Sequence, residues 1–213
     1  MESSPYEPKK IALIEEITAA FDGVSREDGV TLHEATVLDD YGSLEERAEA
    51  RKQDTEDNWQ DVPEADIGFT DAVLSFLDPK GFHYYIPAYV VWYLRNIDNE
   101  DSNYYSSNTF DSIMFHLAAG FHDQVNDFYL SKFKLFTPEQ AKAIAHFLMF
   151  EAEREDAAQT KYEQLRHESM SKEGFSQEEV DAARQEAEQF RKECDLPESD
   201  ARRALERYWG QFL

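Results

Sequence analysis

The stretch SFLDPKGFHYYIPAYVVWYL, residues 75–94, is the most aromatic part of the chain and decides how its fold is interpreted. Residues 78–81 (DPKG) are typical of a turn, because proline fixes φ at the first central position and glycine often follows. The β-prone residues 82–86 predict a short strand or hairpin arm, and Pro87 suits the first turn of a helix that continues to Arg95. The apolar run covers only about half of a membrane span. We therefore expect this stretch to form the core.

Helix caps elsewhere in the sequence predict an α-rich protein. Thr31 and Ser43 each stand three residues before a glutamate, which is the spacing of a capping box. Gly42 is a suitable stop for the first of these two helices. Thr137 followed by Pro138 gives the clearest helix start in the chain.

These patterns predict a mainly α fold with one small β-hairpin, in three parts. Residues 1–8 form a flexible arm, 9–151 a compact α-rich core domain, and 152–213 a helical extension. The segment 128–136, FYLSKFKLF, fits either a second strand or a helical turn. Within the extension, two apolar seams at helical spacing predict a helical hairpin. The seams are Ala158, Tyr162 and Leu165, and Val180, Ala183, Ala187, Phe190 and Cys194.

Charge limits the classes of partner. The 213 residues include 45 Asp and Glu against 21 Lys and Arg, a formal net charge of -24. Direct nucleic-acid binding and attraction to an anionic membrane both need the opposite sign. A basic protein surface is the complementary partner. One cysteine and an N-terminus without an apolar signal segment lead us to expect a cytoplasmic protein.

The densest acidic region, together with one tryptophan, is the predicted binding surface. Its spacing does not fit a calcium-binding loop, so we expect either a solvated face or a docking patch for a basic partner. The residues of this predicted surface are Glu34, Asp39, Asp40, Glu45, Glu46, Asp54, Asp57 and Trp59.

Catalytic and metal-binding motifs are weak, and we predict no cofactor. The dipeptide His122-Asp123, with His83 or His116 upstream, resembles the pattern of HD-type metal phosphohydrolases, in which imidazole and carboxylate hold a divalent ion that activates water. The alternative is that His122 flanks a helix end and Asp123 is solvated. No HExxH, phosphate-binding glycine loop or GxSxG motif is present in the sequence.

The aromatic stretch also offers a possible small-ligand pocket. In that interpretation Asp78 and His83 lie at the lip, and Tyr85 and Tyr89 line the wall. The alternative is that these aromatic side chains are core, each burying a large area while its hydroxyl finds a partner.

The sequence resembles a bacterial family of uncharacterised proteins, a domain of unknown function, over residues 9–151. The resemblance rests on LHEATVLDDYGSLEERAEARKQDTEDNW, LSFLDPKGFHYYIPAYVVWYL and FTPEQAKAIAHFLMF. The positions that fit the middle motif are Asp78, Gly81, Phe82, Tyr85, Pro87, Ala88 and Tyr89. The resemblance implies a domain boundary but no activity. From charge we expect a noncatalytic interaction module of the immunity or antagonist type, with mimicry of nucleic acid as one version and the metal phosphohydrolase as the alternative.

Overall fold

The computed structural model describes residues 6–69, 71–98, 103–120, 125–172, 175–193 and 199–213. Every regular element in these ranges is a helix, and no strand occurs in them. The α-helices are α1 (Glu7–Ala20), α2 (Leu32–Asp39), α3 (Leu44–Ala50), α4 (Glu64–Phe69), α5 (Pro79–Asn96), α6 (Asn103–Leu117), α7 (Asp127–Phe133), α8 (Pro138–Lys172), α9 (Gln177–Glu193) and α10 (Asp200–Arg207). The short 3-10 helices are η1 (Arg51–Gln53), η2 (Trp59–Asp61), η3 (Asp71–Ser75) and η5 (Trp209–Phe212).

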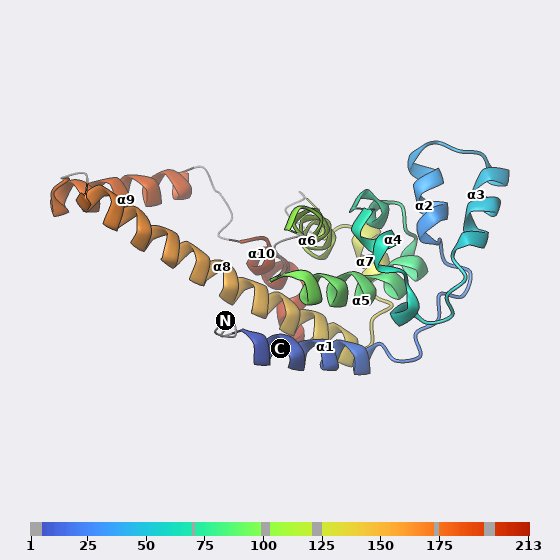
Figure 1. Cartoon of the computed structure of the whole chain (residues 1–213). Coiled ribbons are helices and arrows are strands. Elements are labelled where there is room, and N and C mark those ends of the chain that lie inside the picture. Colours follow the sequence, from blue (N-terminus) through green and yellow to red (C-terminus); the bar gives the residue numbers. More distant parts are fainter. Residues whose placement is uncertain (1–5, 70, 99–102, 121–124, 173–174, 194–198) are drawn as a thin grey trace.

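Helix α5 is the centre of the fold. Thirteen of its eighteen residues are buried, and α1, α4, α6 and α7 pack around it (Figure 1). Tyr84, Tyr85 and Tyr89 are fully buried. The aromatic stretch is therefore core, as the sequence predicts.

The predicted strand at 82–86 is wrong, because α5 begins at Pro79 and includes these residues. Asp78 is the N-cap, and its Oδ1 accepts hydrogen bonds from the amides of Gly81 at 2.8 Å and Val30 at 2.9 Å. A Cβ at position 81 would lie 2.3 Å from the Val30 carbonyl oxygen, so glycine is needed there for close approach. The DPKG sequence is thus the first turn of a helix, and Pro87 lies inside that helix.

The caps predicted at Thr31 and Ser43 are present. The hydroxyl of Thr31 accepts a hydrogen bond from the Glu34 amide, and Ser43 forms a complete capping box with Glu46. The ambiguous segment 128–136 is not a strand; most of it lies in α7, where Asn126 caps the helix. The mainly α prediction is confirmed.

Helix α8 joins the core to a projecting arm. Ile144, Phe147 and Leu148 in its first half are fully buried, whereas Tyr162 and Leu165 farther along are 62% and 56% exposed. The predicted boundary at 151 falls inside this unbroken helix. Helix α9 turns back from the far end of α8, so that the two form the arm seen at the left of Figure 1.

The predicted extension 152–213 divides between this arm and the core. On α9, Val180 is buried. The side chains of Ala183, Ala187 and Phe190, and Cys194 as a whole, lie outside the described part. Helix α10 and η5 return to pack on α8, and Trp209 is fully buried in the main core.

Candidate docking surface on the α2–α3 hairpin

Helices α2 and α3 are joined by a very short connection. The Tyr41 amide donates to the Leu38 carbonyl at 3.2 Å, and the Gly42 amide donates to the Val37 carbonyl at 2.8 Å. This pair of bonds is the Schellman motif, which closes the end of α2. The Ser43 capping box opens α3 immediately afterwards. The hairpin tip therefore has a defined backbone.

Tyr41 occupies the left-handed position of this motif, with φ +58°. Glycine is the usual residue there, because a Cβ makes this conformation cost about 1–2 kcal/mol. The glycine at 42 meets a different need, since a Cβ on it would lie 2.3 Å from Val37 Cγ1. The tyrosine side chain therefore stands at a position where local folding favours no side chain.

Two large apolar residues are exposed at the tip. Tyr41 is 97% exposed and Leu44 is 74% exposed. They are three residues apart and flank the turn between the helices. Neither contributes to the core, so folding gives no reason for their size.

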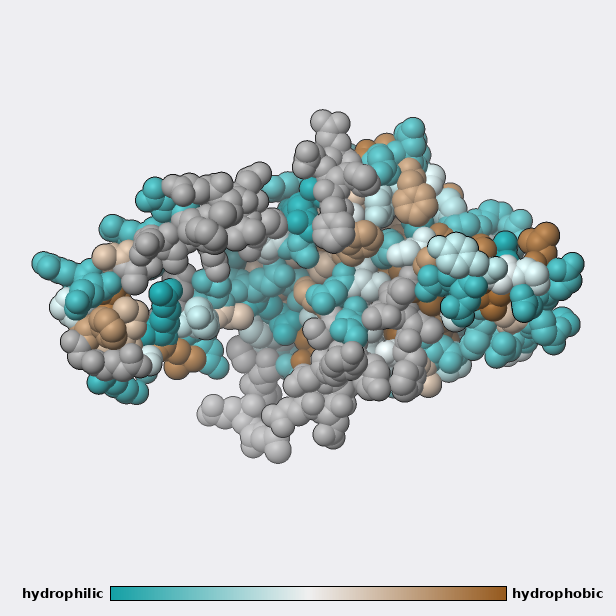
Figure 2. Space-filling model, turned by 90° about the horizontal axis from the view of Figure 1, so that it is seen from above, coloured by the Kyte–Doolittle hydropathy of each residue, from teal (hydrophilic) through white to brown (hydrophobic). Residues whose placement is uncertain are grey.

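Exposed carboxylates surround these two residues. Asp39 and Asp40 precede Tyr41, and Glu45 and Glu46 follow Leu44; all four are exposed. Glu46 also accepts the Ser43 amide at 2.8 Å, and this hydrogen bond lowers the pKa of the Glu46 carboxyl. In Figure 2 the α2–α3 end, on the right, is mostly hydrophilic, with isolated hydrophobic side chains among the polar ones.

Glu34 holds the hairpin together instead of facing a partner. It is buried, and its two carboxylate oxygens accept hydrogen bonds from Arg47 at 2.7 Å and from Arg51 at 2.8 Å. Burial raises the pKa of Glu34, but the hydrogen bonds from the two guanidinium groups outweigh it and the pKa lies below its usual value. This triad fixes α3 and η1 against α2.

Two other members of the predicted surface are also inside the protein. Asp54 is buried, and its carboxylate accepts a hydrogen bond from the His33 backbone amide. The other carboxylate oxygen of Asp54 lies 2.8 Å from His33 Nδ1. Trp59 is 2% exposed and donates its indole N–H to the Phe21 carbonyl at 2.9 Å. Asp57 is exposed, on the loop between these two residues. The tip thus brings together Asp39, Asp40, Glu45 and Glu46 from the predicted set.

The predicted pocket residues are occupied by internal contacts. Tyr85 donates to Glu56 at 2.9 Å and accepts from Arg26 at 2.6 Å. His83 Nε2 lies 2.8 Å from Gln140 Oε1, and Asp78 caps α5. Tyr85 and Tyr89 are fully buried in the core, whereas Asp78 and His83 are half-buried and held by these hydrogen bonds.

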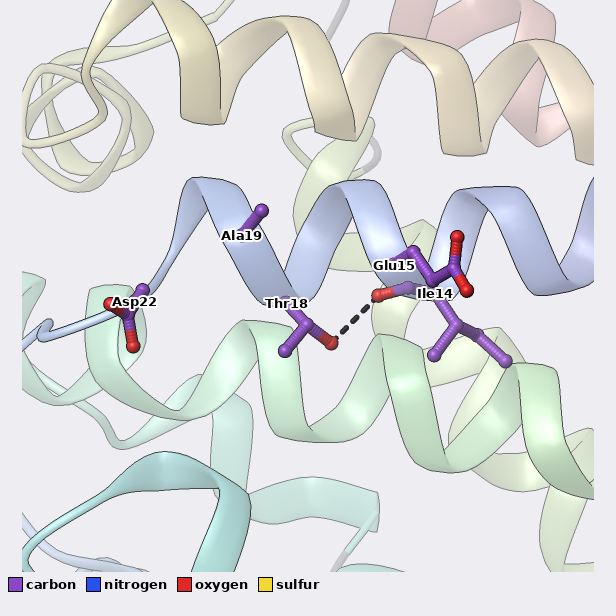
Figure 3. A pocket seen from close by; sticks show the side chains of 5 residues that line it. All are labelled: Ile14, Glu15, Thr18, Ala19 and Asp22. Carbon is purple, nitrogen blue, oxygen red and sulfur yellow. Dashed lines mark hydrogen bonds between the residues drawn. The ribbon is translucent and has the colours of Figure 1, made fainter.

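A shallow depression does occur along α1, lined by Ile14, Glu15, Thr18, Ala19 and Asp22 (Figure 3). The Thr18 hydroxyl already donates to the Ile14 carbonyl at 2.7 Å. Since all five residues come from α1 and the turn after it, opposing elements do not converge on a ligand. We assign it no function.

A histidine–serine pair that the sequence did not reveal lies at the C-terminal end of α6. His116 is buried, and its Nε2 is 3.2 Å from Ser75 Oγ, while its Nδ1 has no hydrogen-bond partner. An unpaired N–H is the rarer defect inside proteins, so the proton is placed on Nε2, which donates to Ser75. Burial, with a contribution from Lys132, lowers the pKa of His116 to about 3. An imidazole with so low a pKa does not take the proton of Ser75. The hydrogen bond between the two side chains instead joins η3 to α6.

The phosphohydrolase candidates His122 and Asp123 lie outside the described residues. Within the described ranges, no group of three or more His, Cys, Asp or Glu side chains is placed to hold a metal ion. None of the helices there is long and apolar enough to cross a membrane.

Sequence reasoning missed Tyr41 and Leu44. Gly42 was expected to end α2, and it does lie at the end, but the left-handed residue is Tyr41. The residues DDYGSLEE show which side chains are present but not whether they are exposed. Exposure is what separates Tyr41 and Leu44 from core residues of the same kind.

Comparison with known proteins identifies a family without an assigned role. The model of a family of unknown function, DUF6714, matches residues 9–172. Neither the curated proteins nor the solved structures gave a match. The matched range includes the α2–α3 hairpin and ends with α8.

Proposed function

We propose, for a chain that belongs to the DUF6714 family of unknown function, that it is a noncatalytic interaction module whose α2–α3 hairpin docks onto a basic surface of a partner protein. The observation that carries this proposal is the exposure of Tyr41 and Leu44, at 97% and 74%, on a closed turn bordered by carboxylates.

The chemistry of the tip fits a protein partner. Tyrosine is enriched among the residues that dominate binding energy, because it buries a large area and loses little conformational entropy. Carboxylates around such an anchor steer a basic partner and reject an acidic one. The net charge of -24 adds long-range attraction for a basic partner.

An antagonist or immunity protein that neutralises a basic effector is the most concrete version of this function. Mimicry of the phosphate array of a nucleic acid is less well supported, because such an array has no apolar centre corresponding to Tyr41 and Leu44. A partner with a shallow apolar site surrounded by lysine or arginine fits both features of the tip.

The rigidity of the hairpin supports the same role. Glu34 joins α2 to α3 and η1 through two arginines, and the Schellman motif and capping box fix the turn. A surface that is ordered before binding loses less entropy on association. The tip is therefore prepared for binding.

The experiment starts with the full chain immobilised and used to capture proteins from its native host at low and high salt. Captured proteins are then purified, and their affinity is measured by calorimetry for the wild type and for Tyr41→Gly and Leu44→Ser. We expect a basic partner whose affinity falls steeply with salt and falls by roughly tenfold or more in each variant.

The control is Tyr162→Ser, which removes an aromatic residue that is 62% exposed on the arm, away from the tip. It leaves the affinity unchanged if the tip is the docking surface. A partner that binds Tyr41→Gly and Leu44→Ser as tightly as it binds the wild type would overturn the proposal, as would affinity that does not depend on salt.

A further inference from the structure

The ring of Tyr41 is open on both faces. Tyr41 is 97% exposed, and at this exposure no neighbouring side chain covers the ring. The α2–α3 hairpin forms the end of the molecule opposite the arm (Figure 1), so a large partner can approach the ring without meeting the rest of the protein. The Schellman motif and the Ser43 capping box fix the backbone on either side. The hairpin therefore presents a flat aromatic surface in a defined place.

The negative charge around this ring is not neutralised by neighbours in the sequence. Residues 35–46 contain four acids and no Lys or Arg. The nearest bases after them are Arg47 and Arg51, and both guanidinium groups are bound to buried Glu34, at 2.7 Å and 2.8 Å. These arginines are thus used inside the hairpin, and the charge of the exposed acids is directed at solvent or at a partner.

A complementary surface must combine two features. It needs positive charge for the carboxylates, and it needs an apolar or aromatic face for the Tyr41 ring and for Leu44, which is 74% exposed. Soluble proteins rarely leave such a face open among charged residues unless it has a function of its own. The surface that receives the hairpin is therefore expected to be a binding site that already has its own ligand.

The chemistry of that ligand follows from the same two features. A flat ring attached to a negatively charged chain describes a nucleotide in a single strand. Proteins that bind single strands combine a positively charged groove with aromatic side chains on which the bases stack. Proteins that bind a duplex contact its phosphates and the edges of its bases, because the base faces are stacked inside. Tyr41 offers a free ring face together with the charge, so the tip resembles the single strand.

We propose that the basic partner of the α2–α3 hairpin is a protein that binds single-stranded nucleic acid, and that Tyr41 stacks in the place of a base while the surrounding carboxylates take the place of phosphates. This inference rests on the proposed function, because it names the partner of the same surface. The chain then competes with the strand for the partner's site. Its net charge of -24 keeps the chain itself from binding the strand.

The test uses the full chain, immobilised and exposed to a lysate of its native host. The proteins of interest are those that the wild type retains and Tyr41→Gly does not. They are eluted in parallel, at equal phosphate concentration, with single strands of about ten thymidine or uridine nucleotides, with a DNA duplex, and with inorganic polyphosphate. We expect the single strands to release them at a concentration at least about tenfold lower than the other two polyanions. Equal release by all three, or release by the duplex alone, overturns the proposal.

Two substitutions separate stacking from simple apolar contact. Tyr41→Phe keeps the flat ring, whereas Tyr41→Leu keeps an apolar side chain without a ring, and both retain a Cβ at the left-handed position. Calorimetry with a released and purified partner should give an affinity within about threefold of the wild type for Tyr41→Phe and roughly tenfold lower for Tyr41→Leu. If Tyr41→Leu binds as tightly as the wild type, the ring does not stack and the proposal is wrong.

The outcomes distinguish this inference from the proposed function. A partner that depends on Tyr41 but is not displaced by a single strand leaves the docking surface in place and overturns only the assignment of the partner. If no retained protein depends on Tyr41, the docking surface and the assignment both fail.

Discussion

The ammonium group of Lys132 donates a hydrogen bond of 3.1 Å to the backbone carbonyl of Leu74 inside the core. The side chain is fully buried, and its Nζ lies 4.8 Å from the centre of the Phe82 ring and 4.5 Å from that of Phe128. One carbonyl and two ring faces replace the water that surrounds an exposed lysine. This contact attaches α7 to the end of η3.

Lys132 gives the first prediction. Burial lowers the pKa of Lys132 to about 8, although Asp78 opposes the shift. The unfolded chain therefore holds this proton up to higher pH than the folded protein does, and the free energy of unfolding gains a term that rises between pH 8 and 10.5. The term amounts to at most about 3 kcal/mol. Urea unfolding across this range shows the rise in the wild type, and Lys132→Met lacks it. The exposed control Lys134→Met retains the rise; a slope that persists in Lys132→Met contradicts the assignment.

Tyr41 gives the second prediction, in which stability and binding change in opposite directions. Tyr41→Gly relieves the left-handed backbone and raises the free energy of unfolding by about 1 kcal/mol. The same change removes the proposed anchor and weakens partner binding. Tyr41→Ala also removes the ring but keeps a Cβ, so it weakens binding without the gain in stability. Thermal unfolding of both variants measures the difference, and equal stability of the two would contradict the role of φ.

Glu34 gives the third prediction. Glu34→Gln removes the charge shared by Arg47 and Arg51 and lowers the free energy of unfolding at neutral pH by about 2 kcal/mol. Because the folded pKa of Glu34 lies below 4.5, the stabilisation in the wild type is present above that pH and is lost as the pH falls below it. Chemical unfolding as a function of pH should show a smaller loss at acid pH in the variant. Glu45→Gln, on the exposed side of α3, is the matched control and should behave as the wild type does.

Glu151 gives the fourth prediction, with the opposite sign. Burial raises the pKa of Glu151 from 4.5 to about 7, so the folded protein holds a proton that the unfolded chain releases. The stability that this proton provides is present below pH 4.5 and declines as the pH rises to 7, by up to about 3 kcal/mol. Glu151→Gln removes this decline. A variant that keeps the full slope between pH 4.5 and 7 would show that another group titrates there.

The sequence predicted the fold class because caps and apolar stripes are local signals. Thr31, Ser43 and Thr137 begin helices as their spacing to the following polar residues indicates. These signals depend on the chain within one turn. Residues far apart in sequence do not alter them.

The prediction failed at 82–86 for a physical reason. Aromatic residues such as Phe82 and Tyr85 favour strands when one face is exposed, but α5 is buried around nearly its whole circumference. A helix that is apolar on all sides has no stripe to recognise. The cap at Asp78 was visible in the sequence and was interpreted as a turn.

The candidate surface could be predicted only in part. A count of acids does not distinguish Glu34, which is buried between two arginines, from Asp39 or Glu45 on the outside. The partners that make this difference lie 13 and 17 residues away along the chain. Trp59, buried against Phe21, shows the same limit for an aromatic residue.

The unbroken course of α8 has a mechanical consequence. Its 35 residues make a rod roughly 50 Å long. One end is anchored in the core by Ile144, Phe147 and Leu148, and the other end projects from the core and packs with α9. A helix without a joint transmits torque along its axis. Force applied to the arm therefore acts as leverage on the contacts that α8 makes with α5, such as the hydrogen bond between Gln140 and His83.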